Sequence, residues 1–251
     1  MSPPFIVAVA VAGLLAGMIN AAIGSGSLLT FPMLLAAGYS PLVANVSSTV
    51  GLIFGSFSGS FGYRRELAGQ GHRVLQLGGF ALVGGLTGAF LLLLLPASIF
   101  RGVVPVLVLF AVALVIAQPW LAAALEHRRG GRAGTLALRA GVFATGVYGG
   151  YFGAAQGVLL IGILGVLIAD RLQRLNGLKT MLATIINGTA SVVFVILAPV
   201  AWQAVLVLGA TSLVGGQLGA HVGRRLPPRL LRGLIVVGGT AVVVKLLVFS
   251  T

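Results

Sequence analysis

The chain has 251 residues, of which 58% are hydrophobic and 8% charged, and its mean hydropathy is +1.11. A soluble domain could not hide so much apolar surface, whereas several membrane spans of about 20 residues account for it directly. In a soluble protein the net charge of +13 would suggest nucleic-acid binding. Here the basic residues fall in short loops between apolar stretches, so they indicate topology, and no nucleic-acid partner is expected. The absence of cysteine excludes disulfides and thiolate metal ligands.

The N-terminus, residues 1–4, has no basic residues of the kind that open a signal peptide, so no cleavage is expected. In chain order the apolar segments are 5–23, 27–37, 42–62, 74–95, 102–120, 139–152, 156–168, 178–198, 203–222 and 230–249. Six of them are long enough to cross about 30 Å of hydrocarbon: 42–62, 74–95, 102–120, 178–198, 203–222 and 230–249. Segments 27–37, 139–152 and 156–168 are too short to cross. Segment 5–23 is ambiguous, because it has the length of a span but its counterpart 139–152 does not.

A pattern of ten residues recurs in register 131 residues later. The first copy comprises Leu82, Val83, Gly84, Gly85, Gly88, Ala89, Leu95, Pro96, Arg101 and Gly102. The second comprises Leu213, Val214, Gly215, Gly216, Gly219, Ala220, Leu226, Pro227, Arg232 and Gly233. Repeats in a membrane protein usually indicate two halves packed about a pseudo-two-fold axis, with a transport site between them.

The distribution of Lys and Arg predicts how the spans are oriented. Fourteen of the sixteen basic residues fall in or beside four loops, near residues 64–73, 128–139, 171–179 and 224–232. Placing these loops in the cytoplasm puts both termini outside and inverts one half relative to the other. Equivalent links also differ in charge, since 38–41 is neutral where 170–174 is charged.

The predicted fold is an all-α polytopic membrane protein of two inverted-topology repeats, each a short helical hairpin plus three transmembrane helices. The first repeat is 1–120, with its hairpin at 5–37. A basic cytoplasmic linker at 121–138 follows. The second repeat is 139–251, with its hairpin at 139–168. A bacterial cytoplasmic membrane is the expected location.

The turns of the two hairpins are the first candidate site. The first turn contains Asn20, Gly24, Ser25, Gly26 and Ser27, and the second contains Gly149, Gly150, Gly153, Gln156 and Gly157. Gly and Ser before a new helix leave backbone N–H groups at its electropositive N-terminus, which favours an anion. Paired breaks at matching positions indicate a transport site. Alternatively, these glycines only permit close helix packing.

Polar residues on the following helices are the second candidates. The first half supplies Asn45, Ser48 and Thr49, and the second supplies Asn176, Lys179, Thr180 and Asn187. The 131-residue offset aligns Ser48 with Lys179, so a cation replaces a hydroxyl in one half only. The alternatives are interhelical hydrogen bonding for the neutral residues and a Lys179 that reaches the membrane surface.

Acidic residues are limited to Glu66, Glu126 and Asp170, in or beside the predicted cytoplasmic loops. No membrane-embedded carboxylate is therefore available to bind a cation, which favours an anionic substrate. The three scattered histidines, His72, His127 and His221, do not form a metal site, and no cofactor is expected. No base is positioned by the sequence to activate a serine, so an enzyme is not expected.

At these residues the chain resembles the TauE/SafE sulfite-exporter family of membrane permeases. The matching features are Gly24 to Ser27, Pro32, Gly38, Ser40-Pro41, Ala44-Asn45, Ser48-Thr49, Gly149-Gly150, Gly153, Asn176 and Lys179. The resemblance covers both halves in order, and it implies transport of sulfite, thiosulfate, sulfoacetate or a related organosulfonate. Ser25 and Ser27 stand where members of that family often have further glycines.

The sequence thus predicts a secondary transporter of a small anion, embedded in the lipid bilayer and working by alternating access between the two turns. A passive anion channel of the same architecture is the alternative. The predicted substrate-binding residues are Asn20, Gly24, Ser25, Gly26, Ser27, Asn45, Ser48, Thr49, Gly153, Gln156, Gly157, Asn176, Lys179, Thr180 and Asn187.

Overall fold

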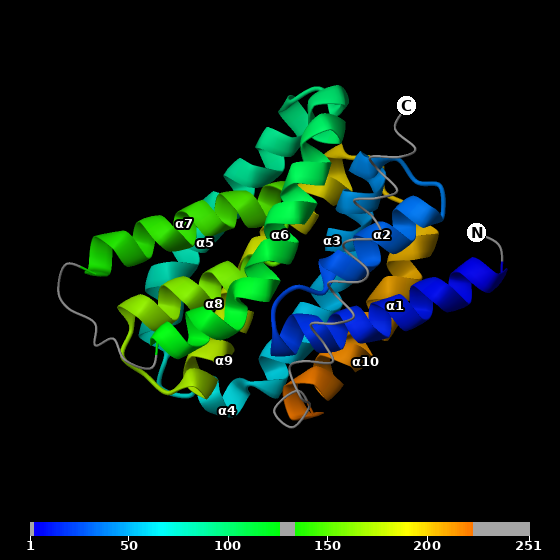
Figure 1. Cartoon of the computed structure of the whole chain (residues 1–251). Coiled ribbons are helices and arrows are strands. Elements are labelled where there is room, and N and C mark those ends of the chain that lie inside the picture. The colour runs from blue at the N-terminus through cyan, green and yellow to red at the C-terminus, as the bar shows by residue number, and fades with distance from the viewer. Residues whose placement is uncertain (1–2, 126–133, 223–251) are drawn as a thin grey trace.

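The computed structural model describes residues 3–125 and 134–222, and the regular elements in these ranges are all α-helices (Figure 1). The helices of the first half are α1 (Pro3–Ala22), α2 (Ser27–Ala36), α3 (Pro41–Gly62), α4 (Arg64–Leu67), α5 (Gly71–Leu94) and α6 (Ala97–Leu125). Those of the second half are α7 (Gly134–Tyr151), α8 (Gln156–Leu167), α9 (Leu172–Leu197) and α10 (Trp202–Val222).

Six of the described helices are long and apolar enough to cross a membrane: α1, α3, α5, α6, α9 and α10. Five of these match predicted spans, and the sixth predicted span, 230–249, lies outside the described residues. Segment 5–23, ambiguous in the sequence, forms the 20-residue helix α1. Of the three other hairpin helices, α2 and α8 are short, as predicted, with 10 and 12 residues. Helix α7 has 18 residues, more than predicted, and is not among the six candidate spans.

Some helix boundaries differ from those predicted. Helix α9 begins at Leu172 rather than 178, and α7 begins at Gly134 rather than 139. The added residues of α9 include Gln173 and Arg174, which end an apolar stretch in the sequence but are good helix formers. The added residues of α7 precede Arg139, which interrupts the apolar stretch in the same way. The short helix α4, with the sequence Arg-Arg-Glu-Leu, was not predicted, because its polar residues appeared to be loop.

Local sequence explains where the hairpins begin and end. Gly24 and Gly153 follow the ends of α1 and α7 with φ of +90° and +76°, a left-handed conformation that glycine adopts without steric cost. The third helix starts with Ser40 as its N-cap and Pro41 in its first turn, a combination well suited to a helix start.

The repeated glycines lie where helices of the two halves touch. A Cβ atom on Gly88 of α5 would be 2.1 Å from the Val147 carbonyl oxygen of α7. The matching Gly219 of α10 would meet the Met18 carbonyl oxygen of α1 at 2.5 Å. Small residues thus let backbones pack directly, as in many membrane proteins. Each hairpin therefore packs against a span of the opposite half.

The equivalent long helices α3 and α9 run antiparallel. Near the start of α3, the Thr49 carbonyl oxygen accepts a hydrogen bond from Ser191, which lies late in α9. Near the end of α3, Ser60 bonds Thr184, which lies earlier in α9. Because residue numbers increase along α3 while those of the contacting residues in α9 decrease, the two helices point in opposite directions. This pair forms the centre of the bundle.

Candidate functional site

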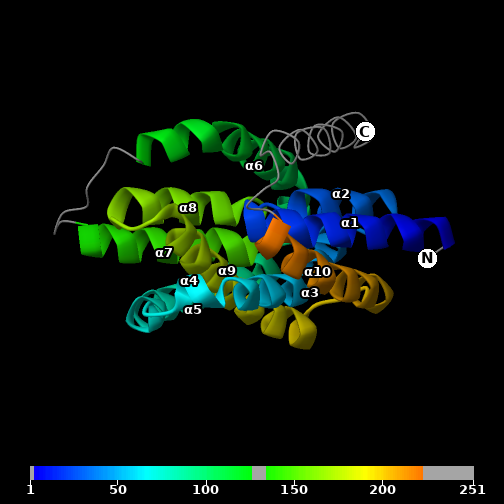
Figure 2. The same cartoon turned by 90° about the horizontal axis from the view of Figure 1, so that it is seen from below.

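The two helix breaks meet inside the bundle. The backbone N–H of Gly157 donates to the Gly24 carbonyl oxygen at 3.0 Å, and a Cβ on Gly24 would lie only 2.4 Å from Gly157 Cα. Figure 2 shows the hairpins α1–α2 and α7–α8 on opposite sides of the centre, with their turns toward one another. Phe31 of α2 contacts Phe152 of the second turn edge to face, with ring centroids 5.4 Å apart. The two turns thus pack closely against each other at the glycines where the helices are interrupted.

At the end of each broken helix, a side chain from the opposite half donates hydrogen bonds to the last carbonyl groups. The Lys179 ammonium of α9 donates to the carbonyl oxygens of Ala21 and Ala22, at 3.2 and 3.5 Å, where α1 ends. The Asn45 amide of α3 donates at 3.0 Å to the carbonyl oxygen of Tyr151, where α7 ends. Helix C-termini carry unpaired carbonyl groups and partial negative charge, so amide and ammonium donors stabilise them.

Lys179 is buried, with 1% of its surface exposed. The structure therefore does not support the alternative in which this side chain reaches the membrane surface. Among the described residues it is the one charged side chain in the buried class, and no carboxylate there pairs with it. Its acceptors are neutral carbonyl oxygens, so in its protonated form Lys179 has no negative counter-charge among the described residues.

Two polar atoms at the turns are buried without a partner in the described part of the chain. They are Ser25 Oγ in the first turn and Gln156 Oε1 in the second. A buried polar atom without a hydrogen bond costs about 1–3 kcal/mol, so native structures rarely keep one without a reason. Both atoms belong to residues that the sequence predicted as substrate ligands.

Three side-chain pairs fix the hairpins to the long helices. Thr30 of α2 and Ser48 of α3 share a short hydrogen bond. The Gln156 amide of α8 donates to Asn187 Oδ1 of α9 at 2.8 Å. The Asn20 amide of α1 donates at 2.8 Å to the Ser56 hydroxyl of α3. Predicted site residues thus support the turns from both halves.

Other predicted residues make bonds within their own helices. Thr49 donates to the Asn45 carbonyl oxygen, and Thr180 donates to the Asn176 carbonyl oxygen, at 3.0 and 2.8 Å. Thr180 also packs beside Gly59 of α3. Because these hydroxyl groups bond backbone carbonyl oxygens of their own helices, Thr49 and Thr180 satisfy their donors without a substrate. The predicted turn residues Gly26, Ser27 and Gly153 lie within or beside the breaks.

Sequence reasoning missed three residues that shape the turns. Thr30 bonds Ser48, Ser56 bonds Asn20, and the Tyr148 hydroxyl donates to the Ala154 carbonyl oxygen at 2.6 Å. Thr30 was detectable as a polar residue inside an otherwise apolar short helix. Tyr148 gave no comparable signal, since a tyrosine in a membrane helix more often marks an interface.

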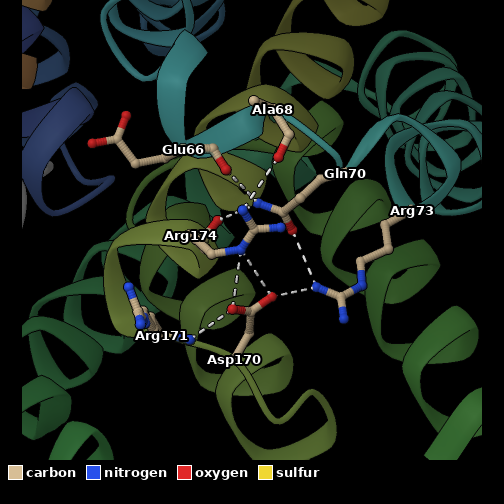
Figure 3. A network of polar contacts seen from close by, with 7 residues as sticks. All are labelled: Glu66, Ala68, Gln70, Arg73, Asp170, Arg171 and Arg174. Carbon is tan, nitrogen blue, oxygen red and sulfur yellow. Dashed lines mark hydrogen bonds and ion pairs between the residues drawn. The ribbon is translucent and has the colours of Figure 1, made fainter.

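Two of the four predicted cytoplasmic loops, near 64–73 and 171–179, lie together at one end of the bundle. This end, here named the basic end, carries Arg64, Arg65, Arg73, Arg171 and Arg174. The other two loops fall largely outside the described residues. Asp170 bonds the side chains of Arg73 and Arg174 (Figure 3). The Gln70 amide donates to the Glu66 and Arg174 carbonyl oxygens, both at 2.9 Å. This network joins the α4–α5 loop of the first half to the α8–α9 link of the second.

The Asp170 carboxyl group has a pKa below its ordinary value. Burial by itself raises this pKa, but hydrogen bonds from the Arg73 side chain, the Arg171 backbone and the Arg174 side chain outweigh it. Donors that bond a carboxylate favour its charged form. Asp170 is therefore ionised at neutral pH and serves as the counter-charge for two arginines.

No group of three metal-ligating side chains occurs in the described ranges 3–125 and 134–222. The bundle of apolar helices, two of them broken at a buried polar centre, defines a polytopic integral membrane protein of the transporter type. The sulfite exporter TauE/SafE family profile matches residues 9–246. The chain belongs to this family of membrane transporters.

Several curated bacterial proteins are similar along most of their length. "Probable membrane transporter protein YfcA" of Escherichia coli K12 is 29% identical over 239 residues, covering 93% of this chain and 86% of that protein. "Probable membrane transporter protein ORF9" of Sinorhizobium sp is 28% identical over 250 residues, covering 96% and 92%. A Haemophilus influenzae "Probable membrane transporter protein" is 24% identical over 228 residues, covering 90% and 88%. No solved structure matches.

Proposed function

We propose that this protein is a secondary transporter of a small anion, an oxidised sulfur compound such as sulfite or an organosulfonate such as sulfoacetate. It moves its substrate across the bacterial cytoplasmic membrane by alternating access at a site between the two hairpin turns. The observation that carries this proposal is Lys179, a buried cation whose ammonium lies against the end of a broken helix.

Charge favours an anion at this site. A buried ammonium without a carboxylate is costly, and carbonyl dipoles compensate it only in part. A negatively charged substrate beside Lys179 supplies the missing counter-charge. A metal or organic cation would instead add to the positive charge, and no described carboxylate lies there to receive it.

Hydrogen-bonding groups at the turns support the same assignment. Ser25 Oγ is buried and unpaired among the described residues, so it is free to donate to a substrate oxygen. The N-termini of α2 and α8 begin at these turns, and helix N-termini favour anions. We assign substrate contact first to Lys179 and Ser25, which can donate hydrogen bonds, and next to Gln156, whose unpaired Oε1 atom can accept one from a protonated substrate oxygen. The other predicted ligands act around them: Asn20, Gly24, Gly26, Ser27, Asn45, Ser48, Thr49, Gly153, Gly157, Asn176, Thr180 and Asn187.

Alternating access follows from two inverted repeats, residues 1–120 and 139–251, joined by the linker 121–138. The antiparallel course of α3 and α9 supports this inversion, as does the packing of each hairpin on the opposite half. We orient the basic end toward the cytoplasm, following the positive-inside rule, with both termini outside. Rocking of one repeat, or of the hairpins, against the rest of the bundle would expose the site to either side.

Uptake by proteoliposomes tests the site. Wild-type protein is expected to take up labelled sulfite or sulfoacetate, and Lys179→Ala to abolish uptake while its size-exclusion profile and helical circular dichroism stay unchanged. Arg171→Ala is the matched control, because Arg171 is an exposed cation near the start of the same helix. Full uptake by Lys179→Ala would remove Lys179 from the site.

The concentration dependence of transport distinguishes the proposed carrier from a passive anion channel. The rate of transport by a carrier saturates as the substrate concentration rises. Substrate on the opposite side of the membrane stimulates transport, because the binding site must return to its starting side in each cycle. A channel gives flux that rises without saturation over the same range and shows no such stimulation. Non-saturating flux would replace the carrier proposal with the channel.

A further inference from the structure

A polar cavity of about 310 Å³ lies at the basic end, between the first turns of α5 and α7 and the end of α8. Its polar side chains are Arg73, Gln76, Thr135 and Arg139. This cavity is separate from the hairpin turns, and none of its lining residues belongs to the proposed transport site. It offers two guanidinium groups and neutral hydrogen-bonding groups within one small volume.

An apolar groove of about 580 Å³ adjoins the polar cavity on the outer face of the bundle. It lies between α5 and α7 and is lined by Gly79, Phe80, Val83, Leu136, Ala140 and Phe143. Arg139 lines both spaces, so the cavity and the groove adjoin at this side chain. Leu136 is 78% exposed, as expected for a side chain that faces lipid rather than protein.

The two arginines keep donors available for a ligand. No carboxylate among residues 3–125 and 134–222 pairs with Arg139, whose guanidinium lies 5.8 Å from the Phe80 ring centroid. Arg73 bonds Asp170 and Gln70 through Nη1 alone, so its other two nitrogens have no acceptor in the described part of the chain. Guanidinium groups recognise phosphate oxygens well.

We propose that this is a binding site for an anionic phospholipid, with its phosphate headgroup in the polar cavity and one acyl chain in the adjoining groove. Charge complementarity selects a headgroup of net negative charge. The adjoining apolar groove favours a lipid over a soluble phosphate, which would leave the groove unfilled. Basic pockets between membrane helices recognise such headgroups.

The lipid joins two elements of opposite halves, because α5 belongs to the first half and α7 to the second. A ligand that binds only the native protein raises its apparent stability. Phosphatidylglycerol is therefore expected to raise the thermal unfolding temperature of the full-length protein in detergent more than phosphatidylcholine does.

Arg139→Gln tests the headgroup contact. One basic residue near an anionic membrane surface contributes about 1 kcal/mol, so binding of phosphatidylglycerol should weaken about fivefold. Native mass spectrometry or a lipid titration measures this change. Arg171→Gln is the matched control, since Arg171 is an exposed arginine at the same end but outside the cavity. Equal weakening in both variants would indicate general surface charge and overturn the site.

Gly79→Leu tests the groove. A Cβ added at Gly79 meets nothing within 4 Å, so leucine occupies the groove without disturbing the protein. Gly102→Leu is its control, because Gly102 on α6 is equally open but lies outside the groove. Lipid binding should fall in Gly79→Leu alone. Unchanged binding in Gly79→Leu would remove the acyl-chain contact and overturn the proposal.

Glycerol phosphate and inorganic phosphate separate a lipid from a free anion. At concentrations matched to phosphatidylglycerol, neither is expected to raise the unfolding temperature or compete for the site. If either stabilises the protein as strongly as the lipid, and Arg139→Gln removes that effect, the cavity binds a soluble phosphate and the lipid assignment is wrong.

Discussion

The side chain of Gln156 occupies the space that a Cβ atom at Gly149 would fill, since its Oε1 atom is 1.8 Å from that position. Gly149 lies four residues before Gly153, as Asn20 lies four residues before Gly24. Asn20 bonds α3 directly, whereas in the second half a glycine makes room for Gln156 to bond α9. Each half thus anchors its hairpin with one amide side chain, supplied from different positions.

This anchor predicts coupling between Gln156 and Asn187. Each alanine variant should lower the unfolding temperature, and the double variant should lower it by less than the sum. The expected coupling is about 0.5–1.5 kcal/mol, the usual contribution of one hydrogen bond. Chemical denaturation in detergent measures it. Strict additivity would show that the 2.8 Å contact contributes nothing to stability.

Gly24→Ala should destabilise the protein and abolish transport, because the new methyl group would collide with Gly157. The variant also forces alanine into a left-handed conformation, which costs about 1–2 kcal/mol. Gly38→Ala separates the two effects. Gly38 has nearly the same φ, +91° against +90°, but a Cβ there meets nothing within 4 Å.

The comparison of thermal unfolding and uptake between these two variants isolates the contact. Gly38→Ala should keep uptake and lose stability only through backbone strain. Comparable losses in both variants would mean that strain at the turn, rather than the meeting of the two hairpins, makes Gly24 necessary.

Acidification should expose the contribution of Asp170 to stability. Its folded-state pKa lies below the ordinary value of 3.8, so its stabilising effect is present above that value and is lost as pH falls through the folded pKa. Asp170→Asn should therefore unfold at a lower temperature at pH 7 and lose less stability on acidification below about pH 4. Unfolding temperatures at a series of pH values measure both effects. A variant with a wild-type pH profile would contradict the role of the Arg73 and Arg174 contacts.

Labelling of single cysteines tests the inverted topology directly, because the native chain contains no cysteine. Ser40 and Arg171 are the exposed N-cap residues of α3 and α9, and they are separated by the same 131 residues as the sequence repeat. In intact cells an impermeant maleimide should modify Ser40→Cys but modify Arg171→Cys only after permeabilisation. Labelling of both cysteines from the same side would disprove the inversion.

Much of the architecture was predictable because membrane burial leaves a strong signal. Long apolar stretches gave five described spans, and paired Gly-rich segments gave both helix breaks. Boundaries at α7 and α9 were wrong, since polarity ends an apolar segment without ending a helix. Helix α4 was missed for the same reason.

The candidate site was less predictable because its donors act on backbone atoms. Asn45 and Lys179 were recognised as polar residues, but their acceptors are carbonyl groups of Tyr151, Ala21 and Ala22, which no side-chain pattern reveals. The direct contact of Gly24 with Gly157 likewise depends on backbone positions. Only the three-dimensional arrangement joins residues more than a hundred positions apart.

The pairing of α1 with α10 also has a consequence for biosynthesis. The glycine surface that receives α1 lies on Trp202–Val222, so the ribosome must complete most of the chain before that partner exists. Until then, the newly inserted helix α1 lies in the lipid bilayer without α10, the helix against which it finally packs. Premature termination before α10 would leave this helix unassembled, and quality-control proteases should remove such fragments rapidly.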